Sequence, residues 1–282
     1  MYNIEKTNDK GIFKMTEYGK RAGELFDGGC NCAQAVSGAF AEKFSASIDM
    51  VTKIASSFGG GIAGRREDRL KEIQERFGAE RVSYRVMDVT EASATVALDE
   101  LIAEVGAPDA LLYASGIGKQ NPTLDADIEL RTVETNCVGM VRLVDHFVNY
   151  VKREPAYNKK HKAHIAVITS VAGTMGMGPA PAYSATKSMQ STYLVALAQH
   201  ARMERIPLSV GDIRPGFVAT DILNPEKRYP MLMSVERAAR FVVRSLRRHQ
   251  RITIFDWRYR LLVGFWRCIP RRVWERLTMI RN

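Results

Sequence analysis

The stretch from Thr169 to Lys187 constrains the fold of this chain more than any other segment. It begins at the end of the apolar run Ile165 to Thr169, which is typical of a buried strand. It leads into residues 182–203, which contain neither proline nor glycine and therefore favour a helix. Sheets built from such strand and helix units place their sites at the carboxyl ends of strands. We therefore expect the hydroxyl group of Ser170 to lie in a site, where it can hold a carbonyl oxygen.

Tyr183 and Lys187 are four residues apart on the expected helix, so their side chains lie on one face, one turn apart. An ammonium group beside a phenol favours the phenolate and lowers the pKa of the phenol from its usual value of about 10. The pair therefore predicts a general acid–base site that works near neutral pH. The alternative is a surface pair without function, because tyrosine and lysine share this spacing on many helices. The residues around the pair favour the site.

Four features together resemble the short-chain dehydrogenase/reductase family: Ser170, the thirteen-residue interval to Tyr183, the run Tyr-Ser-Ala-Thr-Lys that ends at Lys187, and the run Arg-Pro-Gly-Phe-Val-Ala-Thr from Arg214 to Thr220. The resemblance covers about residues 62–282. It implies an α/β fold with a Rossmann-like, doubly wound parallel sheet. It also implies an oxidoreductase that transfers a hydride between NADP(H) and a small-molecule carbonyl or alcohol substrate.

The resemblance implies a role for each of four catalytic residues. Tyr183 donates the proton, Lys187 lowers the pKa of Tyr183 and holds the cofactor ribose, and Ser170 fixes the substrate oxygen. Asn136 lies where the family carries an asparagine that holds a water molecule for a proton relay. An asparagine in an apolar helix can also simply satisfy backbone groups. The order Asn, Ser, Tyr, Lys along the chain favours the relay.

Cofactor contacts follow from the same register. Residues 64–70 resemble the turn after the family's second strand, and a helix to Phe77 follows. Arg65 and Arg66 in this turn suit a phosphate on the adenine ribose, which favours NADP over NAD. The alternative is a solvated charge cluster that opens a helix. The resemblance assigns the remaining cofactor contacts to Asp88, Val89, Ala114, Ser115, Gly116, Tyr183, Lys187, Pro215, Gly216, Val218 and Thr220.

Apolar periodicity predicts the other elements of this part of the chain. Residues 81–89 alternate as a strand, 92–105 form an amphipathic helix, 109–113 and 208–213 are buried strands, and 150–162 are a charged, exposed excursion. Residues 113–116 read Tyr-Ala-Ser-Gly where the family has Asn-Asn-Ala-Gly. The small residues that let a cofactor approach are kept, but the two asparagines that are expected to brace the sheet are lost.

The family's first strand and its glycine turn, Thr-Gly-x-x-x-Gly-x-Gly, are missing from this register. Such a turn binds the cofactor pyrophosphate through free amide groups and the helix dipole. The glycine-rich stretch from Ser56 to Gly64 does not supply it, because Gly64 already ends the second strand. In an alternative register Met50 to Ala55 form the first strand, but no second strand then remains. Loss of this central strand predicts weak or absent cofactor binding, unless residues 50–64 fold into its place.

Residues 1–61 are expected to form a separate, helical N-terminal segment. The run from Gly29 to Val36, followed by the glycines at 59–61, resembles the start of the C-GCAxxG-C-C redox family over about residues 15–64. Cys30 and Cys32 fall short of the four ligands of a usual metal site, so no metal is expected. The simplest interpretation is a fusion of this segment to a reductase domain at residues 62–282. A natural fusion and an assembly error look alike at this level.

Charge and cysteine content limit the partners and the compartment. Much of the net charge of +10 lies in residues 244–281, where basic and apolar residues alternate, which argues against nucleic acid and suits peripheral contact with a membrane. The favoured alternative is a C-terminal helix that packs its apolar residues against the body. Four scattered cysteines, and no charged and then apolar leader, predict a cytoplasmic protein. The family resemblance also implies a homo-oligomer, paired through the helices that carry Asn136 and Tyr183.

A second hypothesis for the function comes from the missing turn. In it the chain is a catalytically inactive fusion or a misassembled product, and acts at most as a binding module. Cofactor titration separates this hypothesis from the first. The specificity loop at residues 222–233 contains Tyr229, Met231, Leu232 and Met233 and no decisive polar group, so it favours an apolar substrate without identifying one.

Overall fold

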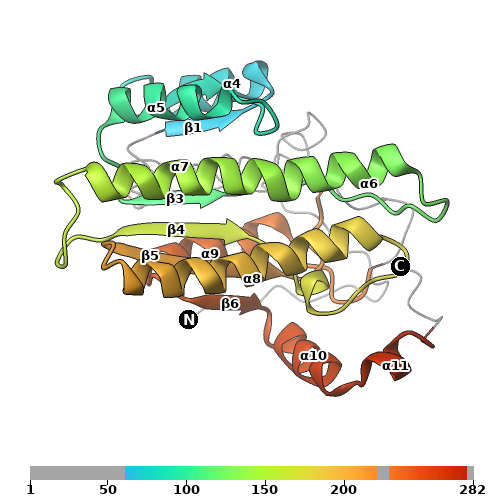
Figure 1. Ribbon diagram of the computed structural model, residues 1–282. Helices are drawn as coiled ribbons and strands as arrows, with labels where there is room; N and C mark the ends of the chain where they lie inside the picture. The colour runs from blue at the N-terminus through green and yellow to red at the C-terminus, as the bar shows by residue number, and fades with distance from the viewer. Residues whose placement is uncertain (1–60, 221–228, 278–282) are drawn as a thin grey trace, which may run out of the picture.

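The structure, a computed structural model, describes residues 61–220 and 229–277 of the 282-residue chain. Strands and helices alternate along these residues, and neighbouring strands pair in parallel. Parallel neighbours require crossover connections, which the helices supply. The described part is therefore the α/β, Rossmann-like fold that the sequence predicts (Figure 1).

The elements that the sequence predicts are present with similar bounds, and the structure adds others, among them a helix at residues 235–247 and a strand at residues 252–255. The described strands are β1 (Gly61–Gly64), β2 (Ser83–Val86), β3 (Ala110–Tyr113), β4 (Ala163–Ile168), β5 (Leu208–Pro215) and β6 (Ile252–Phe255). The described helical segments are α4 (Glu67–Phe77), α5 (Ala94–Val105), α6 (Ala126–Val133), the π-helical segment η1 (Glu134–Val138), α7 (Gly139–Arg153), the 3-10 turn η2 (Val171–Thr174), α8 (Pro181–Met203), α9 (Val235–Arg247), α10 (Trp257–Cys268) and α11 (Arg271–Trp274). Only β2 is clearly shorter than the run 81–89 that was expected to form it.

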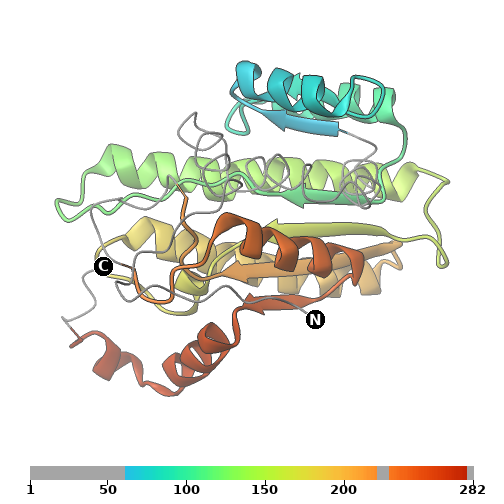
Figure 2. The same cartoon turned by 180° about the vertical axis from the view of Figure 1, so that it is seen from behind.

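The described strands form two sheets rather than one. In the larger sheet the order is β3, β4, β5, β6, while β1 pairs with β2 in a separate two-stranded sheet. Helices α7 and α8 cover one face of the larger sheet and α9 covers the other, as Figures 1 and 2 show from opposite sides. The β1–β2 sheet and its helices α4 and α5 form a lobe, which contacts the rest through α5 and α7.

The break between the sheets lies where the sequence predicts a missing strand. That strand's neighbours in the favoured register are the strand that ends at Gly64 and the strand at 109–113, which are β1 and β3. Among the described strands, β1 pairs only with β2, and β3 pairs only with β4. β1 directly precedes α4, as the favoured register requires. Met50 to Ala55, the first strand of the alternative register, lie outside the described residues.

The core forms around β4, because its residues 163–167 are all buried. A strand buried on both faces has an uninterrupted apolar run, and β4 follows this rule apart from His164. On one side of the sheet, α7 packs against β4 through apolar residues that recur every three or four positions. This spacing places them on one face of the helix. These buried positions of α7 are Met140, Leu143, Val144, Phe147, Val148 and Val151.

The prediction of an exposed excursion at residues 150–162 is partly wrong. α7 continues to Arg153, and the ring of Tyr157 is buried. Its hydroxyl group donates a hydrogen bond to the backbone oxygen of Pro108 at 2.7 Å, so the loop is fixed beside the start of β3. Composition did not indicate this buried ring, because charged residues surround Tyr157 in the sequence.

The predictions for residues 1–60 lie outside the described residues. They include the helical N-terminal segment, Cys30, Cys32 and the resemblance to the C-GCAxxG-C-C family, all of which stay predictions. No helix of the described part is both long and apolar enough to cross a bilayer.

Candidate active site

The amino end of α8 fixes the position of Tyr183. Pro181 opens the helix, where its fixed φ angle suits the first turn and its missing N–H is not needed. The backbone N–H of Ala182 donates to Oε2 of Glu129 at 2.7 Å. Glu129 belongs to α6, so a carboxylate from a neighbouring helix caps the positive end of the α8 dipole. Tyr183 therefore lies on a first turn that is held from outside the helix.

A cleft of about 390 Å³ opens beside this turn. Ser170, Tyr183 and Lys187 all line it, so the structure brings three of the four predicted catalytic residues to one place. Ser170 directly follows β4, at the carboxyl end of the strand, as the sequence predicts. Six predicted cofactor contacts also line the cleft: Ala114, Gly116, Pro215, Gly216, Val218 and Thr220.

Lys187 is almost completely buried, with 4% of its surface exposed. Its Nζ atom donates to the backbone oxygen of Ile168 at 3.0 Å and to Oε1 of Gln190 at 3.1 Å. The same atom lies 5.8 Å from the centre of the Tyr183 ring. The ammonium group therefore lies over the phenol in a fixed position, which is the arrangement that the four-residue spacing predicts.

Asn136 lies behind the cleft rather than in its lining. It is fully buried in η1, where its Oδ1 accepts from the backbone N–H of Ile117 at 2.8 Å. Its Nδ2 donates to the backbone oxygen of Ile117 and to Oγ1 of Thr186. The side chain thus holds the loop after β3 against α8. This is the backbone-satisfying role that the sequence leaves as an alternative, and the proton-relay role stays a prediction.

A buried polar group supports the strand ends under Ser170. Thr169 donates from Oγ1 to Oδ1 of Asp212 at 2.6 Å, and Arg214 donates from Nε to Oδ2 of the same carboxylate at 2.8 Å. Asp212 is 1% exposed. A buried carboxylate is tolerated when it is paired and hydrogen-bonded. These hydrogen bonds hold the carboxyl ends of β4 and β5 together. They thereby fix the position of Ser170 relative to the loop at residues 215–220.

The loop after β3 forms one wall of the cleft. A Cβ atom at Gly116 would lie 3.3 Å from Nζ of Lys187, so glycine at this position leaves room beside the ammonium group. Ser115, also predicted to contact cofactor, is not in the cleft lining. Burial raises the pKa of Tyr113, and its hydroxyl group donates to the backbone oxygen of Thr135 at 3.0 Å. Tyr113 therefore supplies a brace at a position where the family has asparagine.

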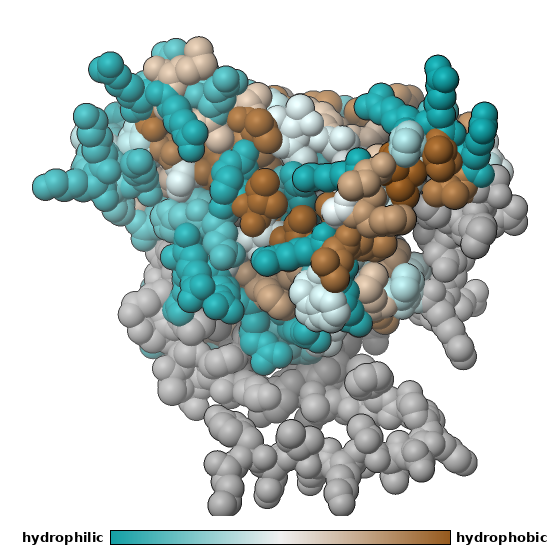
Figure 3. Space-filling view, turned by 90° about the horizontal axis from the view of Figure 1, so that it is seen from below, coloured by the Kyte–Doolittle hydropathy of each residue, from teal (hydrophilic) through white to brown (hydrophobic). Residues whose placement is uncertain are grey.

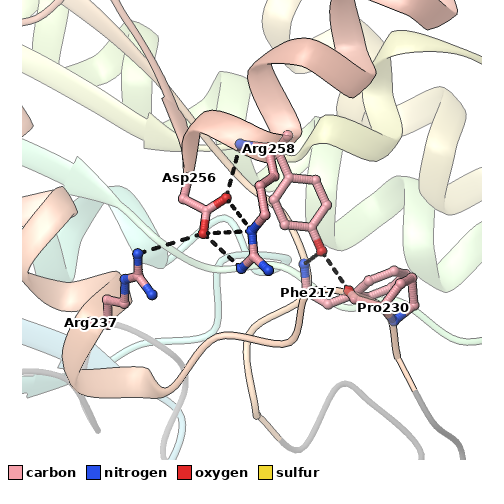
Figure 4. Close-up of polar contacts among 6 residues, drawn as sticks. Phe217, Pro230, Arg237, Asp256 and Arg258 are labelled. Carbon is pink, nitrogen blue, oxygen red and sulfur yellow. Dashed lines mark hydrogen bonds and ion pairs between the residues drawn. The ribbon is translucent and has the colours of Figure 1, made fainter.

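Helix α10 forms another wall, which the sequence did not predict. Tyr259, Leu262 and Trp266 line the cleft from this helix. The hydroxyl group of Tyr259 accepts from the backbone N–H of Phe217 at 3.0 Å and donates to the backbone oxygen of Pro230 at 3.0 Å (Figure 4). Tyr259 thus links Phe217, which precedes residues 221–228, to Pro230, which follows them. No local motif could have revealed this contact, because Tyr259 and Phe217 are 42 residues apart.

Gln190 was also missed, although a signal was present. It lies three residues after Lys187, on the same helix face, and it is fully buried. Its Nε2 donates to the backbone oxygen of Asn136 at 2.7 Å while its Oε1 accepts from Lys187. One amide group therefore connects two predicted catalytic residues.

The residues predicted to contact adenosine lie outside the cleft, at the carboxyl ends of β1 and β2. Nη1 of Arg65 is 3.7 Å from Oδ2 of Asp88, and Arg66 is exposed at the start of α4. Burial acts to raise the pKa of Asp88, but hydrogen bonds from Thr90 and the charge of Arg65 outweigh it and hold the pKa below its usual value. Val89 packs against Gly139 of α7.

The described residues fit one end of a nicotinamide dinucleotide well. The cleft has small residues at positions 114 and 116, a buried ammonium donor at Lys187, and a volume in the range of small-ligand sites. Arg65 is the described cation nearest to Asp88 and has 66% of its side chain exposed, so it is accessible to a phosphate group. The cleft is therefore better defined than the surface around Arg65 and Arg66.

Comparison with protein families gives a match to the short chain dehydrogenase model over residues 50–229. The match therefore starts at residue 50, whereas the sequence analysis predicts that the resemblance starts at about residue 62. An uncharacterized oxidoreductase of Myxococcus xanthus is 24% identical over 80% of this chain and 94% of its own. The 3-oxoacyl-[acyl-carrier-protein] reductase FabG of Escherichia coli is 27% identical over 68% of this chain and 83% of its own. The chain spans about half of dehydrogenase/reductase SDR family member 7B from Xenopus laevis, at 25% identity over 57% of this chain.

Solved structures show the same fold. A 3-ketoacyl-ACP reductase from Sinorhizobium meliloti aligns with a TM-score of 0.61 at 21% identity and covers 76% of this chain and 95% of its own. A short chain dehydrogenase from Burkholderia cenocepacia, solved in complex with NADP, aligns with a TM-score of 0.62 at 15% identity and covers 77% of this chain and 84% of its own. The family match extends over more than half of the chain and includes Ser170, Tyr183 and Lys187. The chain therefore belongs to the short-chain dehydrogenase family.

Proposed function

We propose that this chain reduces a carbonyl compound, or oxidises the corresponding alcohol, with NADP(H) as cofactor. One observation carries the proposal: Ser170, Tyr183 and Lys187 line a single cleft together with the loops expected to contact the cofactor. The bound nicotinamide supplies or accepts the hydride. The protein's own contribution is to orient the substrate oxygen and to move one proton.

Each residue has a distinct part in that contribution. The hydroxyl group of Tyr183 gives its proton to the substrate oxygen in the reductive direction, and the hydroxyl group of Ser170 holds the same oxygen by a hydrogen bond. Lys187, fixed by Ile168 and Gln190, provides the positive charge that favours the phenolate left behind. We also assign the preference for NADP to Arg65 and Arg66, because guanidinium groups bind phosphate well.

The acid–base role is tested by the substitution Tyr183→Phe. With a panel of aldehydes and ketones and NADPH, we expect turnover to fall by about 100- to 10,000-fold, the usual contribution of a general acid. Tyr193→Phe is the matched control on the same helix. Its hydroxyl group contacts Asp145 on α7, so the control variant should keep its activity. Unchanged turnover in Tyr183→Phe shows that another group is the acid.

A weakened or inactive enzyme is the second candidate, and the break between β1 and β3 favours it. A dinucleotide spans the strands at this part of a doubly wound sheet, and among the described strands none joins β1 to β3. A sheet that lacks this strand would bind the cofactor more weakly. Titration of the purified chain with NADPH, followed by fluorescence, distinguishes the two candidates. Tight binding favours the working reductase. Weak or absent binding favours a fusion that acts at most as a binding module.

A further inference from the structure

Helix α10 carries an exposed apolar stripe. Trp257, Leu261 and Phe265 are spaced four residues apart, so they lie on one face of the helix. Their exposed fractions are 66%, 66% and 65%. Figure 3 views the molecule from the side of α10 and α11 and shows hydrophobic and charged side chains intermixed on this face. Three large apolar residues in one exposed row are unusual on a water-facing helix and indicate a contact.

The stripe lies within a basic surface. Residues 257–277 contain six arginines and a single acidic residue, Glu275. Within the described part of the chain, Arg267, Arg271, Arg272 and Arg276 form no ion pair with a carboxylate. All four are exposed. This combination of exposed aromatic or aliphatic residues and unpaired arginines defines what we name the α10–α11 surface.

The α10–α11 surface is held firmly on the body of the protein. Asp256 caps α10 and pairs with Arg258 at 2.8 Å and with Arg237 of α9 at 3.6 Å (Figure 4). Hydrogen bonds from Arg258 hold the pKa of Asp256 below its usual value, so the pairing persists at neutral pH.

Helix α11 is fixed as well. Nε1 of Trp274 donates to the backbone oxygen of Gly176 at 2.7 Å, and the Trp274 ring packs edge-on against Trp266 at 5.4 Å. Both helices project from the β6 side of the molecule in Figures 1 and 2. The surface therefore presents a preformed shape to a partner.

The opposite face of α10 points into the body. Tyr259 and Val263 are buried, and Tyr259, Leu262 and Trp266 line the candidate active site. The favoured expectation of a helix packed against the body is thus correct for this face only. The exposed stripe is the part that packing does not explain.

We propose that the α10–α11 surface docks the protein on an anionic bilayer, with the apolar stripe at the boundary of the acyl chains and the arginines at the lipid phosphates. Amphipathic helices bind bilayers through buried apolar area together with attraction of basic residues to anionic lipids. A second copy of the chain fits this surface less well, because two such faces would bring many arginines together without carboxylates to oppose them. The proposal does not depend on the proposed function.

Vesicle flotation of the full chain tests the proposal. We expect the protein to float with vesicles that contain phosphatidylserine and much less with pure phosphatidylcholine. The combined variant Trp257→Ser, Leu261→Ser and Phe265→Ser should lose flotation. The combined variant Arg267→Gln, Arg271→Gln and Arg272→Gln should bind anionic vesicles about 100-fold more weakly, since each surface arginine contributes about fivefold.

Matched variants elsewhere on the surface control for general loss of hydrophobicity or charge. Val96→Ser, Leu130→Ser and Met203→Ser remove equally exposed apolar residues from α5, α6 and α8, and Arg244→Gln, Arg247→Gln and Arg248→Gln remove charge at the end of α9. Both control sets should float like the original chain.

Two results overturn the proposal. The first is equal flotation of the α10–α11 variants and their controls, or no flotation of the original chain. The second is a change from oligomer to monomer in the stripe variant, measured by light scattering, without any lipid binding. That result would identify the surface as a contact between protein copies.

Discussion

The buried amide of Gln190 shows how a single residue can hold a site together without lining it. Its two ends bond Lys187 and the backbone of Asn136, and all three groups are withdrawn from water. In such surroundings a missing hydrogen-bond partner is costly, because the group left behind cannot turn to solvent.

We therefore predict that Gln190→Met lowers the free energy of unfolding by about 1–3 kcal/mol, the cost of leaving buried polar groups unpaired. Methionine keeps the volume of glutamine but cannot replace either hydrogen bond. Urea denaturation measures the change. Gln199→Met, at an exposed position on the same helix, is the control and should be nearly neutral. Equal stability of the two variants contradicts the prediction.

At this scale the sequence predicts residues whose partners are local. Tyr183 and Lys187 share a helix face, and Ser170 follows a recognisable strand, so spacing alone brings them together. Tyr259 has partners at positions 217 and 230, which only the folded chain brings close. The adenosine contacts at Arg65 and Arg66 stay predictions.

Among the elements, β4 contains one exception to its apolar pattern. His164 is fully buried, its Nδ1 lies 2.8 Å from Oγ of Ser209 on β5, and its ring stacks on His249. Among the described residues its Nε2 has no hydrogen-bond partner. Burial, together with the nearby His249, lowers the pKa of His164 from 6.5 to about 4.

This shift predicts a loss of stability in acid. Between about pH 4 and 6.5 the unfolded chain binds a proton at His164 that the folded chain does not bind, so the free energy of unfolding decreases as the pH falls. The decrease reaches about 3 kcal/mol at the lower end of this range. His164→Asn should remove this pH dependence in urea denaturation, whatever its stability at pH 7. His200→Asn, on the exposed end of α8, should keep it. The same slope in His164→Asn and the original chain refutes the assignment.

Elements with a clear period were predicted well, because one face of each is buried in the core. The charged run at 150–162 was not, since the buried ring of Tyr157 stands among lysines and a glutamate. The walls that α10 contributes were missed for a different reason. Its apolar residues point in two directions, so its pattern does not separate the face in the cleft from the face in solvent.

At the scale of the whole molecule, the two sheets of the described residues should differ in local stability. Among the described strands, β4 and β5 each have a strand on both sides, whereas β1 and β2 pair only with each other, an arrangement with little stability of its own. The lobe of β1, α4, β2 and α5 should therefore unfold locally before the larger sheet.

Hydrogen exchange can measure this difference. We predict that the amide groups of β1 and β2 exchange at least about 100-fold faster than those of β4 and β5 under native conditions. The comparison is internal to one sample, so pH and temperature are matched. Equal protection of the two sheets would show that the lobe opens only when the whole protein unfolds.

The two-sided character of α10 links properties that are usually separate. One side of its twelve residues lines the candidate active site, and the other carries the apolar stripe that we propose binds a bilayer. Selection on either trait then acts through the same short helix. Among related enzymes, substrate preference and membrane binding should therefore evolve together.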